Sequence, residues 1–267
     1  MAYSQLASKY HQGFRFLFLM WVSILLASCS ALDPQQANTQ PVTHEVFDTL
    51  LKKHVGASGL VSYQGFQSDR AQLQAYLTYL TSNPPNDENW NSSEKLAYWI
   101  NLYNAFTVEL VLQYYPLKSI KDIGSSVQVP FVNTPWDIKF IEIGKEKYDL
   151  NNIEHNIIRK LFDEPRIHFA VNCASMSCPK LRPEAYTGVK LEAQLEEQAI
   201  SFLNDPERNV IGANEARISK IFRWYAGDFT KNSDLRDFLN RYAKQKMMEG
   251  AKISYKDYDW SLNEMQN

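Results

Sequence analysis

The chain has 267 residues, of which 45% are hydrophobic and 22% charged, and 28 Lys plus Arg against 30 Asp plus Glu give a formal net charge of -2. This composition is too apolar for a disordered chain, and 10 Gly and 3 Cys are too few for a collagen-like chain or a disulfide scaffold. A near-neutral chain has no concentrated basic face for phosphate backbones, so nucleic acid is not an expected partner.

The first thirty residues have the layout of an export signal. Lys9 and Arg15 precede an apolar run over residues 16–27, and no acidic residue occurs in this segment. The run is shorter than the roughly 20 residues that cross a bilayer as a helix. We therefore interpret residues 1–28 as a cleaved signal peptide and not as part of the fold.

The apolar run ends in the sequence LASC, residues 26–29, which resembles the bacterial lipobox. That resemblance implies that Cys29 is lipidated, becomes the first residue of the mature chain and anchors it to a lipid bilayer through more than one acyl chain. An ordinary cleaved signal, or a membrane anchor with a chance cysteine, is the alternative. Ser30 stands where an inner-membrane retention signal typically has Asp, so we expect an outer-membrane lipoprotein of the cell envelope that faces the periplasm.

A tether and one domain are expected after the signal. Residues 29–43 are mostly small and polar and include two prolines, which is typical of a solvated linker. No second linker divides residues 44–267, so we expect a single globular domain there.

Hydrophobic periodicity predicts two helices at the start of this domain, over residues 44–55 and 69–82, with a strand or extended segment over residues 60–66 between them. A third helix is predicted over residues 92–115. It is apolar on most sides and so is expected to be buried.

Polar residues on that buried helix are candidate functional residues because buried amides and carboxylates need partners. Glu94, Tyr98, Asn101 and Asn104 share one face, at spacings of four, three and three residues. Either they anchor neighbouring backbone, or they line a pocket and bind substrate.

The second half of the chain mixes short strands with helices. We expect a hairpin around Gly144, a helix over 151–162, a buried strand over 166–173, a helix over 190–204, a hairpin over 209–220, a helix over 234–245 and a strand over 252–260. Since strands and helices do not alternate steadily, the pattern predicts an α+β domain with a buried central helix, a small mostly antiparallel sheet and flanking helices.

Two histidines are candidate general bases. His155 lies on the 151–162 helix beside Glu154 and one turn before Arg159, and His168 lies in the apolar 166–173 segment. Histidine has the side-chain pKa nearest neutrality, which suits it to acid and base catalysis. A histidine packed within a helix without any catalytic role is the alternative for His155.

Two cysteines close together form the most unusual local feature. Cys173 and Cys178 flank a Ser-rich turn, and they can form a disulfide, provide a reactive thiol, remain inert or bind a metal. Export favours the disulfide, and a metal site lacks a second close pair of ligands, so no metal or other cofactor is expected. A thiol mechanism would use Cys173 as nucleophile, His155 or His168 as base, and Glu154 or an Asn to orient the imidazole.

The WYAGDF segment, residues 224–229, combines aromatic residues with one acid. Its aromatic residues are interpreted as core, and Asp228 as a helix cap or turn residue.

Four blocks of the chain, YWINLYNAF, NNIEHNIIR, HFAVNCASMSCP with the following LRPEAY, and WYAGDF, occur in an order and spacing that resemble the domain of unknown function 547 family, from about residue 91 to 229. The resemblance implies no established activity. It does imply that a set of residues stands at the family's characteristic positions: Asn101, Asn104, Glu154, His155, Arg159, His168, Cys173, Cys178 and Glu184.

Two functional hypotheses follow. In the first, the domain is an envelope-anchored thiol/His-dependent hydrolase or transferase with a pocket around Asn101, His155 and Cys173, in which Arg159 contributes to binding an unknown small-molecule or peptide ligand. In the second, it is a non-catalytic binding or assembly module of the envelope in which a Cys173–Cys178 disulfide is structural.

Overall fold

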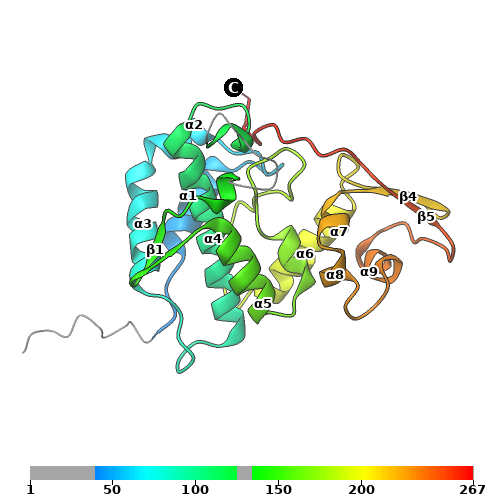
Figure 1. Cartoon of the computed structure of the whole chain (residues 1–267), viewed down its shortest axis with the longest axis horizontal. Helices are drawn as coiled ribbons and strands as arrows, with labels where there is room; N and C mark the ends of the chain where they lie inside the picture. The colour runs from blue at the N-terminus through cyan, green and yellow to red at the C-terminus, as the bar shows by residue number, and fades with distance from the viewer. Residues whose placement is uncertain (1–39, 125–133, 267) are drawn as a thin grey trace, which may run out of the picture. The chain divides into compact units, whose positions relative to one another are not determined.

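Helix α4 (Ser92–Tyr114) runs through the main hydrophobic core of the computed structural model, which describes residues 40–124 and 134–266 (Figure 1). A capping box begins the helix, because the Asn91 side chain accepts the N–H of Glu94 and the Glu94 carboxylate accepts the N–H of Asn91. Every residue from Leu96 to Leu112 except Trp99 is buried. The buried central helix predicted from the sequence is confirmed.

Three helices precede α4: α1 (Glu45–His54), α2 (Tyr63–Ser68) and α3 (Arg70–Ser82). Both α2 and α3 contact α4. Residues 60–66 do not form the expected extended segment over their whole length, because Ser62 caps a helix by accepting the N–H of Gly65, and Tyr63 and Phe66 are both buried at helical spacing. Val42 is also buried, so the chain packs against this core two residues before the predicted start of the domain.

The hairpin around Gly144 is confirmed by β1 (Ile141–Ile143) and β2 (Glu146–Tyr148), which pair antiparallel. Gly144 has a φ of +63°, which suits glycine at the turn. Two single 3₁₀ turns, η1 (Ile120–Asp122) and η2 (Pro135–Asp137), precede the hairpin. The helix predicted after the hairpin is confirmed, but its first part is a π-helix, η3 (Asn152–Ile158), which continues into the α-helix α5 (Arg159–Leu161).

The prediction of a buried strand over residues 166–173 is wrong. The segment begins with a 3₁₀-helix, η4 (Pro165–Phe169), in which the Glu164 carboxylate caps the first turn by accepting the N–H of Arg166. Pro165 at the first helical position favours this turn. A short apolar run does not distinguish a buried strand from a buried helical turn, and here the proline and its cap decide between them.

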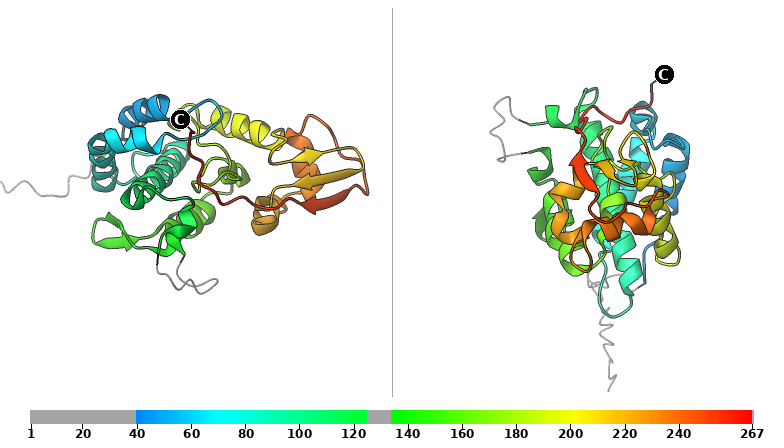
Figure 2. Two further views of the ribbon diagram at one scale, coloured as in Figure 1. Left: turned by 90° about the horizontal axis from the view of Figure 1, so that it is seen from above. Right: turned by 90° about the vertical axis from the view of Figure 1, so that its right-hand side faces the viewer.

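A second core lies around five phenylalanines that contact one another: Phe169, Phe202, Phe222, Phe229 and Phe238. Helices α6 (Leu191–Leu203), α7 (Ile221–Trp224), α8 (Ala226–Phe229) and α9 (Leu235–Tyr242) pack here. Helix α6 joins the two cores, because its first half buries Leu191 and Leu195 in the first and its second half buries Phe202 and Leu203 in the second. The left view of Figure 2 shows this helix in yellow, between the helices of the first core and the sheet of the second.

The sheet of the second core has the order β3 (Val210–Ile211), β4 (Glu215–Ile218), β5 (Lys252–Tyr255). Strands β3 and β4 are antiparallel and β4 and β5 are parallel. With the β1–β2 hairpin, this arrangement confirms an α+β domain with small sheets and flanking helices.

The chain after β5 runs back from the sheet to the first core, as the red segment of Figure 1 shows. Near its end, the N–H of Met265 donates to the carbonyl of Val61, and Glu264 pairs with Val61 in a parallel bridge. Residues 256–266 therefore contact both cores, and on the way they pass the two cysteines. Among the described residues, no helix is long and apolar enough to cross a membrane.

Candidate functional site

Residues 172–179, the thiol loop, carry Cys173 and Cys178 and are fixed to α4 by Asn104. The Asn104 amide donates to the carbonyl of Ala170 (2.9 Å), and its oxygen accepts the N–H of Asn172 (2.8 Å). The Asn172 side chain then closes the loop, since its amide donates to the carbonyl of Pro179 (2.8 Å). Two buried amides therefore hold the entry and the exit of the loop together.

The residue after Cys173 has an unusual backbone conformation. Ala174 is fully buried and has a φ of +58°, and it is the one described non-glycine residue with a positive φ. Such a conformation costs of order 1–3 kcal/mol in a non-glycine residue and persists where the surroundings enforce it. Here the Asn172 side chain accepts the N–H of Ala174 (2.9 Å). The strained residue thus directly follows Cys173 in the thiol loop.

The C-terminal segment pairs with the thiol loop along its length. The N–H groups of Met176 and Ser177 donate to the carbonyls of Ser261 and Asp259 (2.8 and 3.1 Å). From the other side, the Arg208 guanidinium donates to the carbonyls of Cys178 and Met176, both at 2.9 Å. With its backbone groups paired in this way, the loop presents its two thiols from a rigid frame.

The Cys173 sulfur lies among hydrogen-bonding groups. It is 2.8 Å from the sulfur of Cys178, 3.2 Å from the Ser175 hydroxyl and 3.3 Å from the Tyr258 hydroxyl. Burial alone would raise the pKa of Cys173, but the hydrogen bonds with these three groups outweigh it and lower that pKa. A lowered pKa favours the thiolate, which is the nucleophilic form of cysteine.

Cys178 has the opposite character. It is 3% exposed, and the N–H of Cys173 donates to its sulfur at 2.8 Å. Burial and the neighbouring Cys173 raise its pKa well above the ordinary value. Cys178 therefore keeps its proton when Cys173 loses one. Both cysteines are free thiols in the structure, so the disulfide expected from the sequence is not formed there.

Cys173 opens into a cavity of about 420 Å³, the thiol cavity. Its walls are largely aromatic, and polar groups gather around Cys173. Fifteen residues line it: Tyr103, Thr134, Trp136, Asn151, Glu154, His168, Val171, Cys173, Cys178, Pro179, Ile221, Trp224, Tyr225, Tyr258 and Trp260.

His168 is the histidine that lines this cavity, and Asp228 orients it. The Nε2 atom of His168 lies 2.7 Å from Oδ2 of Asp228, and its ring stacks on Tyr225 with centroids 3.9 Å apart. Burial lowers the pKa of His168, against the opposing effect of Asp228, so the ring is neutral near pH 7 and Nε2 carries the hydrogen. Hydrogen bonds from His168 and Arg159, opposed by burial, keep the pKa of Asp228 far below its usual range.

Arg159 holds the other side of Asp228. Its Nε and one Nη donate to the two carboxylate oxygens at 2.6 and 2.9 Å, a bidentate pair. The remaining Nη lies 3.0 Å from Nδ1 of His155. Arg159 therefore binds Asp228, and His155 contacts Arg159. Both were predicted to act on substrate, but neither lines the thiol cavity.

Two proton acceptors in the wall of the thiol cavity are unpaired. Oε1 of Glu154 and Nδ1 of His168 are buried and have no hydrogen-bond partner among the described residues. Leaving a buried acceptor unpaired costs roughly 1–3 kcal/mol. Such groups in a native fold mark places where a ligand, water or catalytic proton transfer completes the bonding.

The structure separates the residues predicted on α4. Asn104 supports the thiol loop, whereas Asn101 is anchored elsewhere: its amide donates to the carbonyl of Tyr186 (2.7 Å) and its oxygen accepts the N–H of Tyr186 (3.0 Å). Neither amide lines the thiol cavity. Both have the backbone-anchoring role that the sequence left open.

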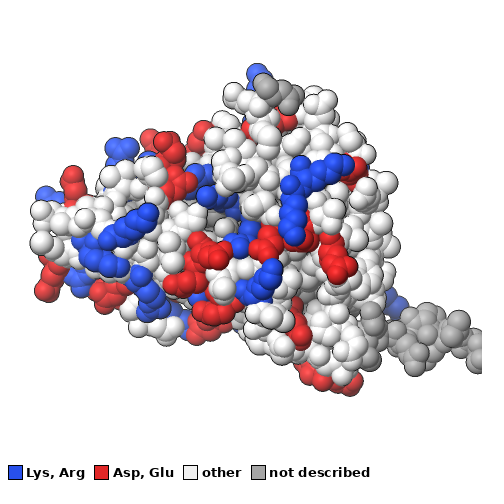
Figure 3. Space-filling model, turned by 180° about the vertical axis from the view of Figure 1, so that it is seen from behind, with Lys and Arg blue, Asp and Glu red and all other residues white. Residues whose placement is uncertain are grey.

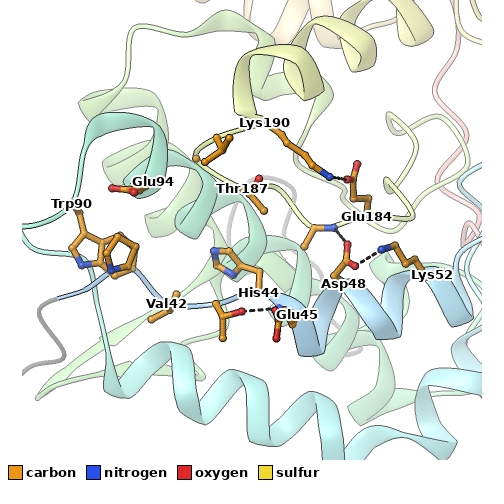
Figure 4. Close-up of a pocket in the computed structure, with 15 residues that line it drawn as sticks. Val42, His44, Glu45, Asp48, Lys52, Trp90, Glu94, Glu184, Thr187 and Lys190 are labelled. Carbon is orange, nitrogen blue, oxygen red and sulfur yellow. Dashed lines mark hydrogen bonds and ion pairs between the residues drawn. The ribbon is translucent and has the colours of Figure 1, made fainter.

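Glu94 lines a different cavity of about 350 Å³ near the start of the domain, together with Val42, His44 and Trp90 (Figure 4). Two ion pairs join charged residues of its lining. Lys190 donates to Glu184 at 2.7 Å, and Asp48 accepts from Lys52 at 2.5 Å, as the dashed lines in Figure 4 show. No described cysteine lines this cavity, in contrast to the thiol cavity.

Surface charges are also interleaved. Lys and Arg alternate with Asp and Glu over the face shown in Figure 3. Ion pairs of this kind join α6 to the preceding segments, for example Arg166 to Glu192 (2.7 Å) and Arg182 to Glu197 (2.6 Å). No group of three or more His, Cys, Asp or Glu side chains within residues 40–124 and 134–266 could hold a metal ion.

Sequence reasoning missed three parts of this site. It interpreted Asp228 as a cap or turn residue, although Asp228 binds His168 and Arg159. It did not select Tyr258 or the tryptophans of the cavity wall. The signal that could have found Asp228 was one acid among aromatic residues, where a buried carboxylate needs a basic partner. The predicted lipidation site Cys29 lies outside the described residues.

Residues 88–203 match a family model described as "Protein of unknown function, DUF547". No curated protein and no solved structure matches the chain. The matched segment contains Glu154, His168, Cys173 and Cys178, whereas Asp228 and Tyr258 follow its last residue.

Proposed function

We propose, starting from the match of residues 88–203 to the DUF547 family of unknown function, that the domain of this chain is a thiol-dependent hydrolase or transferase with Cys173 as the nucleophile. The observation that carries this proposal is the position of the Cys173 sulfur: it lies in the wall of a cavity, within 3.3 Å of three hydrogen-bonding groups that favour its thiolate. Such a thiolate can attack an acyl carbon and form a thioester while the leaving group departs.

His168 would act in the second step of this reaction, in which the thioester on Cys173 is broken down. Its imidazole makes no hydrogen bond to Cys173 in the structure, since the contacts of that sulfur go to Cys178, Ser175 and Tyr258. The proton acceptor that remains on His168 is Nδ1, because Asp228 binds Nε2. In this proposal Nδ1 accepts the proton of the water or other acceptor molecule that attacks the thioester, and Asp228 orients the ring. His155, the first candidate base in the sequence, has its Nδ1 on Arg159 instead.

The aromatic walls of the thiol cavity restrict the kind of acyl donor that can bind. Trp136, Trp224 and Trp260 line the cavity, and Trp260 contacts both of the others with ring centroids 5.7 and 5.8 Å apart. These rings favour an acyl donor whose group next to the scissile bond is apolar or ring-shaped.

The experiment is a reaction with p-nitrophenyl acetate, followed by nitrophenol release and by mass mapping of the protein. Wild type should release nitrophenol in a burst and carry an acetyl group on Cys173, and Cys173→Ser should do neither. His168→Gln should acetylate but turn over at least tenfold more slowly. If Cys173→Ser lowers the melting temperature and leaves nitrophenol release unchanged, the enzyme proposal fails and the assembly-module hypothesis gains support.

His54 provides a matched control. Its Nε2 lies 2.6 Å from Oδ2 of Asp69, so it is a largely buried histidine paired with an aspartate in the same way as His168, but it does not line the thiol cavity. His54→Gln should therefore keep the turnover of wild type after correction for the folded fraction.

We also propose that the protein is a lipoprotein of the outer membrane, anchored through Cys29. The support is the sequence of residues 1–30. In a Gram-negative host grown with an alkyne fatty acid, the wild-type chain should acquire the label and fractionate with the outer membrane. Cys29→Ser should lose both properties. Unlabelled wild type would contradict the proposal.

A further inference from the structure

The two thiols in the wall of the thiol cavity lie very close together, and the proposed acyl transfer does not require this proximity. The sulfurs of Cys173 and Cys178 are 2.8 Å apart, and a disulfide bond is about 2.05 Å long, so they need to approach by only about 0.75 Å to bond. The ends of the loop between them are tied by Asn172. We propose that Cys173 and Cys178 form a reversible dithiol–disulfide couple that exchanges with an external disulfide.

The two cysteines differ in access, and this fixes their order of reaction. Both line the thiol cavity, but Cys173 is half-buried whereas Cys178 is only 3% exposed. An external disulfide therefore reaches Cys173 first. Cys178 can then attack the sulfur of Cys173, its nearest sulfur neighbour.

The exchange balances in two steps. The Cys173 thiolate attacks one sulfur of an external disulfide, so that a mixed disulfide forms on Cys173 and the other half of the external disulfide leaves as a thiolate. Cys178 then loses its proton and attacks the Cys173 sulfur, so that the Cys173–Cys178 bond forms and the second half leaves as a thiolate. Two electrons pass from the protein to the external disulfide. Two external thiols reverse both steps and leave as the external disulfide.

The surroundings of the pair supply what each step requires. Hydrogen bonds favour the thiolate of Cys173, which is the attacking group of the first step. Cys178 keeps its proton until the second step, because burial and Cys173 raise its pKa. An unpaired carboxylate oxygen of Glu154 lies in the wall of the same cavity and can accept a proton there.

This inference rests on the proposed function in one respect: both use Cys173 as a nucleophile. Its consequence is control of that function, because a Cys173–Cys178 disulfide removes the thiolate that attacks the acyl carbon. The redox chemistry itself requires no acyl substrate, so each proposal can fail without the other.

The experiment equilibrates the full chain with reduced and oxidised glutathione in varied ratio, traps free thiols with iodoacetamide and digests with trypsin. Cleavage after Arg166 and Lys180 releases residues 167–180 as one peptide with both cysteines, separate from Cys29. We expect both labels to disappear from this peptide together, in one two-electron transition that reverses when reduced glutathione is restored.

Single variants test the order of the steps. Cys178→Ser and Cys178→Ala should each accumulate one glutathione on Cys173, because the resolving thiol is gone. Cys173→Ser should leave Cys178 unmodified under the same conditions. Because the readout is a mass on one peptide and needs no turnover, it is independent of the acylation assay.

Three results would overturn the inference. One is glutathione on each cysteine independently, and another is no oxidation in the folded wild-type chain. The third is a bond that forms but resists reduction until the protein unfolds, since that is the behaviour of a structural disulfide.

Discussion

Oδ2 of Asp228 lies 2.7 Å from Nε2 of His168, although 60 positions separate the two residues in the sequence. The contact joins η4 of the DUF547 segment to α8, which follows that segment. Arg159 binds the same carboxylate from α5. Three elements therefore meet at one aspartate beside the thiol cavity.

Asp228→Asn should lower the free energy of unfolding by about 1.5–3 kcal/mol, because hydrogen bonds to charged groups contribute about that much and both Arg159 and His168 lose their anionic partner. Urea denaturation at pH 7 measures this loss. Asp69→Asn, which removes the equivalent partner of His54, should keep the acylation turnover that Asp228→Asn loses. Equal turnover in the two variants would contradict a role for Asp228 in the site.

Tyr258→Phe should raise the pKa of Cys173, because it removes a hydroxyl 3.3 Å from the sulfur and keeps the ring. A hydrogen bond contributes about 0.5–1.5 kcal/mol, so the alkylation rate of Cys173 at pH 7 should fall roughly two- to tenfold. The measurement is the iodoacetamide rate against pH. Tyr255→Phe is the control on the neighbouring strand, and an unchanged rate in Tyr258→Phe would show that its hydroxyl does not act on the thiolate.

Asn104→Ala and Asn101→Ala should both destabilise the protein by about 2–4 kcal/mol, since each leaves one buried N–H and one buried carbonyl without a partner. Their effects on the site should differ. Asn104 holds the thiol loop, so its loss should change the alkylation rate of Cys173, whereas the loss of Asn101 should not. Chemical denaturation and alkylation under native conditions test both statements.

His44 makes stability depend on pH. Burial lowers its pKa from 6.5 to about 4. Between these two pH values His44 is therefore largely protonated in the unfolded chain and largely neutral in the folded chain. Stability is therefore complete above pH 6.5 and lost as the pH falls towards 4, by about 2 kcal/mol at pH 5. Urea denaturation at pH 7 and pH 5 measures the loss.

His44→Asn is the variant for this pH dependence, because its side-chain oxygen can still accept from Tyr76, whose hydroxyl lies 2.7 Å from Nδ1 of His44. It should flatten the pH dependence without abolishing it, since burial lowers the pKa of His168 too. The same slope in wild type and variant would assign the pH dependence to other groups.

The sequence predicted the elements with strong periodicity and missed contacts that depend on tertiary structure. The apolar stretch of α4 is long enough to identify both the helix and its burial. The segment 166–173 is too short for that, and its apolar residues fit a 3₁₀ turn as well as a strand.

The same limit applies to the site. Cys173, Glu154 and His168 were selected by residue type, and the structure brings them to one cavity. Asp228 and Tyr258 come from distant segments, and neither a cap-like acid nor a tyrosine near the C-terminus indicates its partner without the fold. His155 was selected for its chemistry, but its side chain contacts Arg159.

The most direct test of the central claim is the alkylation of the native, reduced chain by a limiting amount of iodoacetamide, read on the 167–180 peptide as a function of pH. We predict that Cys173 is labelled before Cys178, with half-maximal rate at a pH below the ordinary pKa of a cysteine. Labelling of Cys178 first, or of neither thiol until the protein unfolds, would contradict it.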